Sequence, residues 1–218
     1  MNTTKFNGFF DPTKVEYPIH IIGCGAIGST LALNLARCGL TEIHLWDYDI
    51  VNPHNIANQQ YNFYDVGDKK TFALAEAVTD INPQAKVYEH GKWDDDQLTG
   101  YVFLAVDSIT TRQAIVKRHL YTSVVKAMFD FRMRLKDAQH FAADWSTIKN
   151  RKVLLSTMNF TEEEAQANNV VNACNMTMSI IPTVDTVVAV GLTNFINFIH
   201  TKEINRLVMV NPFEFDIT

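Results

Sequence analysis

The sequence predicts one α/β domain, in which helices alternate with the strands of a sheet. Short apolar runs of strand length, at residues 19–22, 43–46 and 101–106, alternate with longer stretches that have helical spacing. The first two runs enclose a glycine-rich turn and a helix, which makes a β-α-β unit of roughly 30 residues. At 218 residues the chain is long enough for one large domain and short for two. We therefore treat residues 1–218 as a single domain.

The amino-terminal unit can be followed element by element. Residues 19–22 read Ile-His-Ile-Ile and are stopped by glycine, as expected of a buried strand. Helical spacing of apolar residues then continues from Gly28 to Cys38, and Gly39 stands where a helix C-cap is expected. The next strand, residues 43–46, closes on Asp47.

The middle of the chain continues this alternation. A loop rich in Asn, Pro and Gln, residues 52–62, precedes a predicted helix over residues 67–82, which Pro83 stops. Three further strands are expected, and two of them lead into an aspartate: residues 86–88, residues 101–106 before Asp107, and residues 124–129 before Asp130.

The carboxyl-terminal part is less regular. Residues 131–175 mix charged, amide and aromatic side chains without a clear period. Apolar residues then recur at helical spacing over residues 184–199, which predicts an amphipathic helix. Pro182 and Thr183 mark its start, with Thr183 as a candidate N-cap.

Composition narrows the class of protein. The net charge of −5 argues against a nucleic-acid-binding surface. The three cysteines have no CxxC spacing, so neither a disulfide framework nor a zinc site is expected. Residues 1–6 lack an apolar signal-peptide core, and no run of about 18 uncharged apolar residues is present. We therefore expect a cytoplasmic protein without a membrane partner.

The glycine turn is the first candidate site. Gly23, Gly25 and Gly28 fit G-x-G-x-x-G between a strand and a helix. Such glycines allow a tight turn, close approach of a phosphate to the backbone and close helix–strand packing, while the helix N-terminus offers free N–H groups. Asp47, which follows the next strand, is placed to accept hydrogen bonds from ribose hydroxyls. An adenine nucleotide is the expected ligand, and from these residues alone both NAD and ATP remain open.

The segments that follow resemble the ThiF/MoeB/E1 family, which adenylates the C-terminal carboxylate of ubiquitin-like and sulfur-carrier proteins. Residues 45–59 (LWDYDIVNPHNIANQ) are similar to its D-x-D-x-V-x-x-x-N-L-x-R-Q segment. Residues 65–70 (DVGDKK), 81–83 (INP) and 105–112 (AVDSITTR) match further family motifs in the same order. The resemblance is dense over residues 18–112 and looser from Asp130 onward. It implies a Rossmann-like ThiF/E1 adenylation fold with a mixed sheet and flanking helices. Residues 18–112 would be the nucleotide-binding half, and residues 124–218 the carrier and dimerisation half.

The resemblance also implies roles for individual residues. Asp47 would hold the ribose, Asn55 would orient phosphates or backbone, and Gln59 would support it. Lys70 would bring positive charge to the triphosphate, where charge develops as pyrophosphate leaves. Asp107 would organise Mg²⁺, which needs only one or two carboxylates besides phosphates.

Three departures from the family pattern stand out. The family arginine of N-L-x-R-Q is replaced by Asn58, whose amide supplies no charge; Lys69, Arg132 and Arg134 are the candidate substitutes. The paired CxxC motifs that bind zinc in many members are absent. The usual amino-terminal helix, with its arginine for the partner's site, is not recognisable in residues 1–17.

Several residues have two interpretations. Cys174 is either an acceptor of the activated carboxylate or a buried small residue. Arg132, in a D-x-R-M stretch, either binds a carboxylate or caps its turn, and Arg112 is either a structural ion-pair partner or a substrate contact. His140 and Asp144, four apart, suit one helical face and together with His90 suggest a metal, although a hydrogen-bonded histidine explains them better.

The sequence therefore predicts Mg²⁺- and ATP-dependent adenylation of a carboxylate, with a small ubiquitin-like or sulfur-carrier protein as partner and a homodimer as the assembly. The candidate catalytic residues are Lys70, Asp107, Arg132 and Cys174. The alternative is a nucleotide-binding pseudoenzyme or scaffold of the same fold, which Asn58 motivates. An NAD-dependent oxidoreductase is the third candidate.

Overall fold

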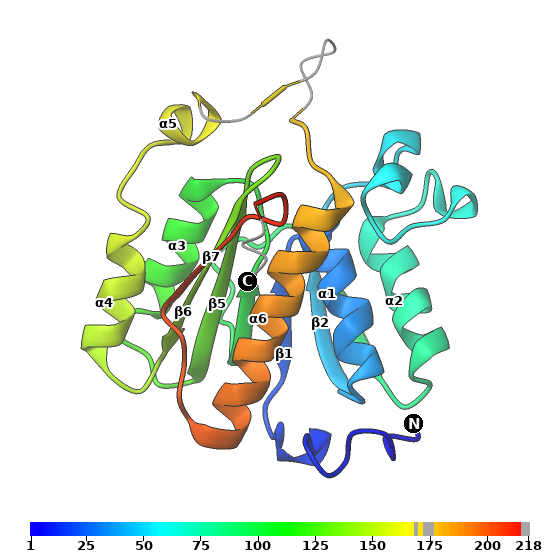
Figure 1. Cartoon of the computed structure of the whole chain (residues 1–218), viewed down its shortest axis with the longest axis horizontal. Helices are drawn as coiled ribbons and strands as arrows, with labels where there is room; N and C mark the ends of the chain where they lie inside the picture. Colours follow the sequence, from blue (N-terminus) through cyan, green and yellow to red (C-terminus); the bar gives the residue numbers. More distant parts are fainter. Residues whose placement is uncertain (168–169, 172–176, 215–218) are drawn as a thin grey trace.

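The computed structural model describes residues 1–167, 170–171 and 177–214. Its centre is a seven-stranded sheet in the order β3-β2-β1-β4-β5-β6-β7 (Figure 1). The strands are β1 (Ile19–Ile22), β2 (Glu42–Trp46), β3 (Lys86–His90), β4 (Gly100–Leu104), β5 (Val125–Met133), β6 (Ala138–Asp144) and β7 (Leu207–Val210). The first five are parallel, and β6 and β7 are antiparallel to their neighbours, so the predicted mixed sheet is confirmed.

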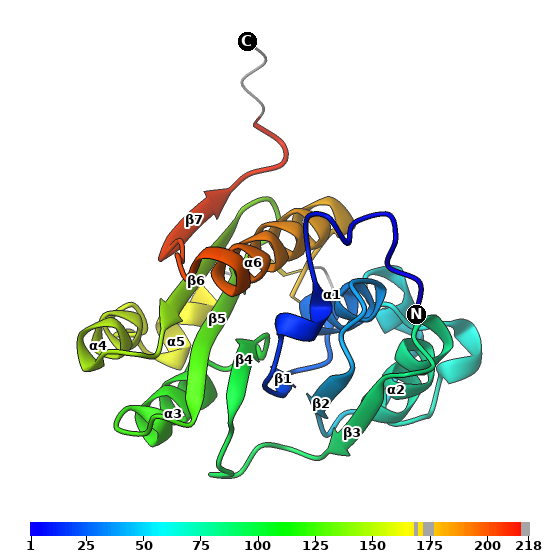
Figure 2. The same ribbon diagram turned by 90° about the horizontal axis from the view of Figure 1, so that it is seen from below.

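Helices cover both faces of the sheet (Figure 2). They are α1 (Ala26–Arg37), α2 (Lys70–Ile81), α3 (Ile109–His119), α4 (Ile148–Ser156), α5 (Glu162–Ala167) and α6 (Ile181–Thr201). The first two pack with α6 on one face, while α3 and α4 lie on the other. Short 3-10 helices, η1 (Pro12–Lys14), η2 (Pro53–Ala57) and η3 (Phe63–Asp65), lie in the connections.

Two hydrophobic clusters fill the space between sheet and helices. One joins α1, α2 and α6 to the sheet through residues such as Leu31, Leu74 and Phe195. The other, around Val116 and Trp145, lies under α3 and α4. Because β1, β2 and β4 are parallel, their carboxyl ends meet at one edge, where ligands bind in open α/β sheets.

Helix α6 is long and apolar enough to cross a membrane by length and composition alone. Its buried residues, among them Val184, Val188 and Phe195, pack against α1, β5 and β6. This packing accounts for the helix's hydropathy within the domain core.

Three local expectations are wrong. The strand expected to end before Asp130 continues to Met133, because residues 127–133 pair with β6. His140 and Asp144, whose spacing suited one helical face, lie in strand β6. Thr183 lies inside α6, whose N-cap is Ile180, and its hydroxyl donates to the Leu135 carbonyl.

Candidate functional site

The glycine turn has the geometry that a phosphate-binding turn requires. Gly23 has a φ of +96°, and a Cβ there would lie 2.8 Å from the backbone of Ala105 and Val106. A Cβ on Gly28 would lie 1.8 Å from the Gly23 carbonyl oxygen, so only glycine allows α1 this close to the turn. Gly25, the N-cap of α1, has nothing within 4 Å of its Cβ position and no side-chain cap. The turn thus leaves an open approach to the positive end of α1.

Asp47 holds this turn from the end of β2. Its Oδ2 accepts the Cys24 N–H at 2.7 Å, and its Oδ1 accepts the Asp49 N–H at 2.8 Å. On the other side, the Tyr61 hydroxyl donates to the Cys24 carbonyl at 2.7 Å. Two side chains therefore clamp the peptide groups of Cys24, and the half-buried Asp47 carboxylate lies beside the turn where a ribose is expected.

Lys70 begins α2 close to this edge. Its side chain is 8% exposed, and Nζ lies 2.8 Å from Asp49 Oδ2. Asp49 is the second aspartate of the D-x-D segment, and no role is predicted for it from the sequence. The Asp49 carboxylate therefore partly neutralises the positive charge of Lys70.

The three amide residues of the predicted site lie in the 3-10 helix η2 and directly after it: Asn55 inside the helix, Asn58 as its C-cap and Gln59 beyond. Asn55 is buried, and its Oδ1 accepts the Asn52 N–H at 2.8 Å, which makes it a capping residue. Asn58 donates to the hydroxyl of Ser179, far along the chain. Gln59 Oε1 is buried and accepts no hydrogen bond from the part of the chain that the structure describes.

Asp107 lies beyond the end of β4 and is exposed. Ser108 follows it as the N-cap of α3. The Glu162 carboxylate, from the start of α5, accepts from Ser108 Oγ at 3.2 Å and from the Thr110 N–H at 3.3 Å. The Glu162 carboxylate therefore lies at the N-terminus of α3, which directly follows Asp107. The acidic run at residues 162–164 is the sequence feature that could have indicated it.

A magnesium ion fits Asp107 only together with a nucleotide. The described residues contain no group of three or more His, Cys, Asp or Glu side chains that could hold a metal by themselves. Magnesium is commonly held by one or two carboxylates plus substrate phosphates. The lone exposed Asp107 suits that arrangement, with the phosphates as the remaining ligands.

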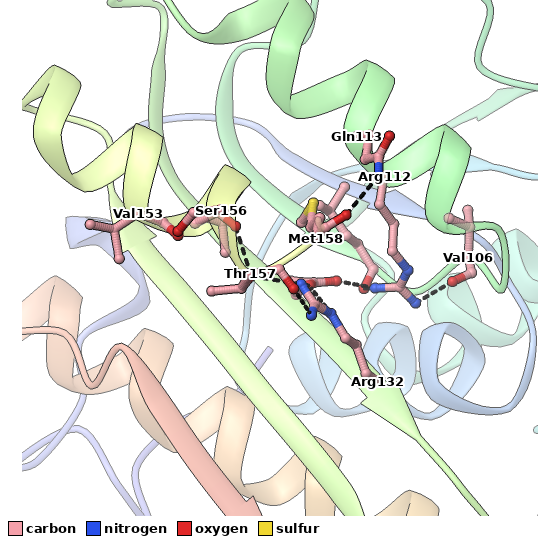
Figure 3. A network of polar contacts seen from close by, with 11 residues as sticks. Val106, Arg112, Gln113, Arg132, Val153, Ser156, Thr157 and Met158 are labelled. Carbon is pink, nitrogen blue, oxygen red and sulfur yellow. Dashed lines mark hydrogen bonds and ion pairs between the residues drawn. The ribbon is translucent and has the colours of Figure 1, made fainter. Parts of the chain in front are cut away.

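Two predicted arginines lie in a buried network behind the site (Figure 3). Arg112 is ion-paired with Asp130 and donates to the carbonyls of Leu104 and Val106. Arg132 pairs with the same aspartate at 2.7 Å and donates to Thr157. Both guanidinium groups are committed to the fold, which favours the structural interpretation of each over a substrate contact. Asp130, the centre of the network, was missed as a functional residue.

Cys174 lies outside the described residues. Burial and the Asp47 charge raise the pKa of the Cys24 thiol, which is inert packing inside the turn. His140 is buried in β6, where its Nε2 contacts Asn194 Nδ2 at 3.1 Å, so hydrogen bonding, not metal binding, explains it. Two surface cavities, of about 360 and 280 Å³, are lined by other residues than the glycine turn and Asp107.

The order of the strands and the glycine turn at their carboxyl ends define a Rossmann-like α/β fold. The ThiF family model matches residues 15–217, and the chain belongs to the ThiF family. Among curated proteins, the ubiquitin-like modifier-activating enzyme 5 of Dictyostelium discoideum is 37% identical over 70 residues, which cover 32% of this chain and 18% of that protein. The Mus musculus enzyme of the same name is 29% identical over 118 residues, covering 45% and 29%.

Solved structures extend the likeness to the whole fold. MccB of E. coli with ATP superposes with a TM-score of 0.69 at 17% identity, covering 95% of this chain and 64% of that one. MccB in complex with N-formylated MccA gives a TM-score of 0.71 with similar coverage, 95% and 65%. The chain thus spans less than a third of these two curated relatives and under two thirds of the MccB chains.

Proposed function

We propose that the protein uses ATP and Mg²⁺ to adenylate the carboxyl terminus of a small partner, either a ubiquitin-like or sulfur-carrier protein or a peptide. The observation that carries this proposal is the open α1 N-terminus at Gly25, which shares one sheet edge with Asp47, Lys70 and Asp107. The names of the relatives support it: ubiquitin-like modifier-activating enzymes, and MccB with ATP or with MccA.

The reaction needs little covalent chemistry from the protein. A carboxylate oxygen of the partner attacks the α-phosphorus of ATP, and a P–O bond forms to give the acyl-adenylate. The bond to the bridging oxygen breaks, and pyrophosphate leaves with the electron pair. Because the attacking carboxylate is ionised, no proton has to move, and catalysis reduces to positioning and charge stabilisation.

The residues divide this work. The free N–H groups of α1 bind phosphate oxygens, Asp47 binds the ribose, and Lys70 stabilises the charge on departing pyrophosphate. Asp107 would hold Mg²⁺, which when bound neutralises phosphate charge.

Exchange of labelled pyrophosphate into ATP tests the proposal. The assay uses purified protein with a candidate small protein that ends in Gly-Gly. We expect partner-dependent exchange that Asp107→Ala abolishes and that the control Asp94→Ala, on an exposed loop, leaves intact. Exchange that Asp107→Ala does not reduce would remove this residue from the site.

A second function, a nucleotide-binding scaffold without adenylation, is favoured by Asn58 in place of the family arginine and by the Asp49 contact of Lys70. It predicts ATP binding with no pyrophosphate exchange for any partner. Thermal shift with ATP against NADH separates both functions from an oxidoreductase.

We further propose that the protein is cytoplasmic and forms a homodimer. Light scattering on the purified protein would test the homodimer.

A further inference from the structure

Asp130 occupies an unusual place for a charged group. It lies in β5 with a side chain that is 0% exposed, and each carboxylate oxygen meets a different arginine. Oδ1 pairs with Arg112 from α3, and Oδ2 accepts from Arg132 Nε at 2.7 Å. A buried carboxylate is costly unless it is fully paired, so both arginines are needed to keep it there.

Arg112 connects the Asp130 carboxylate to the backbone of the loop that carries Asp107. Its Nη1 donates to the Leu104 carbonyl at 3.2 Å, and its Nη2 donates to the Val106 carbonyl. These carbonyls lie at and just beyond the end of β4, immediately before Asp107. The planar fork of a guanidinium can hold both carbonyls and the carboxylate at once, which a lysine cannot.

The same short segment forms a wall of the glycine turn. The Ala105 N–H donates to the Ile22 carbonyl at 2.8 Å, and the Gly23 Cα approaches so closely that a Cβ would lie 2.8 Å from Val106 N. A shift of residues 105–106 is therefore felt both at Asp107 and at the phosphate-binding turn.

Arg132, the second arginine paired with Asp130, contacts a different part of the chain. Arg132 donates to the Thr157 carbonyl at 2.7 Å and lies over the Phe141 ring, 4.2 Å from its centroid. Gln113, next to Arg112 on α3, donates to the Met158 carbonyl at 2.6 Å. These contacts hold the linker between α4 and α5. The linker meets the site only where it ends, at Glu162, which accepts from Ser108 and Thr110 at the start of α3 and does not contact residues 104–106.

We propose that Asp130 is a positioning residue for the nucleotide site. Through Arg112 it sets the backbone of residues 104–106, and with it the placement of Asp107 relative to the glycine turn. The inference rests on the proposed function for its purpose, since it supplies the fixed geometry that an ATP·Mg²⁺ complex would meet. Its physical content, the anchoring of this loop, is independent of any ligand.

The test compares two neighbours on α3, Arg112→Lys and Gln113→Ala. Arg112→Lys keeps the charge opposite Asp130 and loses the fork, so hydrogen exchange should accelerate in peptides covering residues 105–111. Gln113→Ala should accelerate hydrogen exchange over residues 156–162 and, within residues 105–111, at most at Thr110, whose N–H donates to Glu162. With Mg²⁺ present, Arg112→Lys should weaken ATP binding by about 10- to 100-fold, the range found when groups that orient metal ligands are removed. ATP binding without Mg²⁺ should change much less, and Gln113→Ala should leave both affinities within about 2-fold.

The proposal is overturned if folded Arg112→Lys shows unchanged hydrogen exchange over residues 105–111. Equal acceleration there in Gln113→Ala also overturns it, because the loop would then respond to any loosening of α3. If the wild-type protein binds no ATP, the proposed function fails, while the exchange comparison still decides whether Asp130 and Arg112 anchor the loop. Asp130→Asn removes the negative charge that Arg112 and Arg132 share. In folded protein it should accelerate hydrogen exchange over residues 105–111 and over residues 156–162.

Discussion

Lys70 and Asp49 form an ion pair at the edge of the candidate site, with Nζ 2.8 Å from Oδ2. The lysine side chain is 8% exposed and the aspartate side chain 48%, so the pair is screened from one side only. Since exposed pairs contribute little to stability, we attribute its main effect to the charge that Lys70 can offer a phosphate.

Substitution of either partner should therefore change ATP affinity in opposite directions. Asp49→Asn removes a negative charge near the triphosphate and should tighten binding about 5-fold, or roughly 1 kcal/mol. Lys70→Met should weaken binding about 10-fold. Titration calorimetry at low and high KCl measures both, and both effects should shrink with salt. Asp80→Asn, at the far end of α2, controls for net charge; an equal gain there would rule out a local effect.

Two glycines of the turn should fail in different ways when changed to alanine. Gly28→Ala places a Cβ against the Gly23 carbonyl, and such overpacking should lower the free energy of unfolding by about 1–3 kcal/mol. Gly25→Ala meets open space at an ordinary φ of −74°, so stability should change by less than about 0.5 kcal/mol. Its methyl group would nevertheless occupy the phosphate approach and weaken ATP binding. Urea unfolding combined with ATP titration separates the two effects, and comparable stability losses would contradict this division of roles.

The parts of the fold that sequence could predict are those encoded locally. The turn at Gly23 and the position of Asp107 depend on short apolar runs and the residues that end them. The Asp130 network could not be predicted, because it depends on which side chains the register of β4 and β5 brings together. Strand β6 was missed because the buried histidine at 140 breaks the apolar alternation. The contact of Asn58 with Ser179 joins residues 121 apart, beyond any local pattern.

Asn58 offers a direct test of the gap in the family pattern. Asn58→Arg restores the family cation at η2 and should tighten ATP binding about 10-fold, since one added charge near phosphates contributes roughly 1–2 kcal/mol. The change also removes the hydrogen bond to Ser179, so Asn58→Ala is the matched control and should not gain affinity. Pyrophosphate exchange that appears only in Asn58→Arg would favour the scaffold function for the natural chain. No change in affinity would mean that residue 58 does not face the triphosphate.

Three imidazoles lie side by side beneath the site, on β1, β2 and β3. The ring centroids of His20 and His44 are 4.4 Å apart, and His44 Nδ1 lies 3.0 Å from His90 Nε2. Trp46 donates its indole N–H to His20 Nδ1 at 3.2 Å and stacks on His90. The Trp46 carbonyl in turn accepts the Gly23 N–H, so this cluster supports the turn directly.

Acid should therefore destabilise the protein through this cluster. Burial, followed by repulsion from His44 and His90, lowers the pKa of His20 from 6.5 to about 3, and burial likewise lowers the pKa values of His44 and His90. The unfolded chain binds protons near pH 6.5 and the folded chain does not, so the free energy of unfolding falls as the pH drops below 6.5. Each histidine contributes up to about 1.4 kcal/mol per pH unit. Urea midpoints between pH 8 and 5 should decline less steeply for His20→Asn, which keeps an acceptor for Trp46, than for the wild type. The exposed His54→Asn should follow the wild-type slope, and a His20→Asn slope equal to it would show that His20 is already protonated in the folded protein.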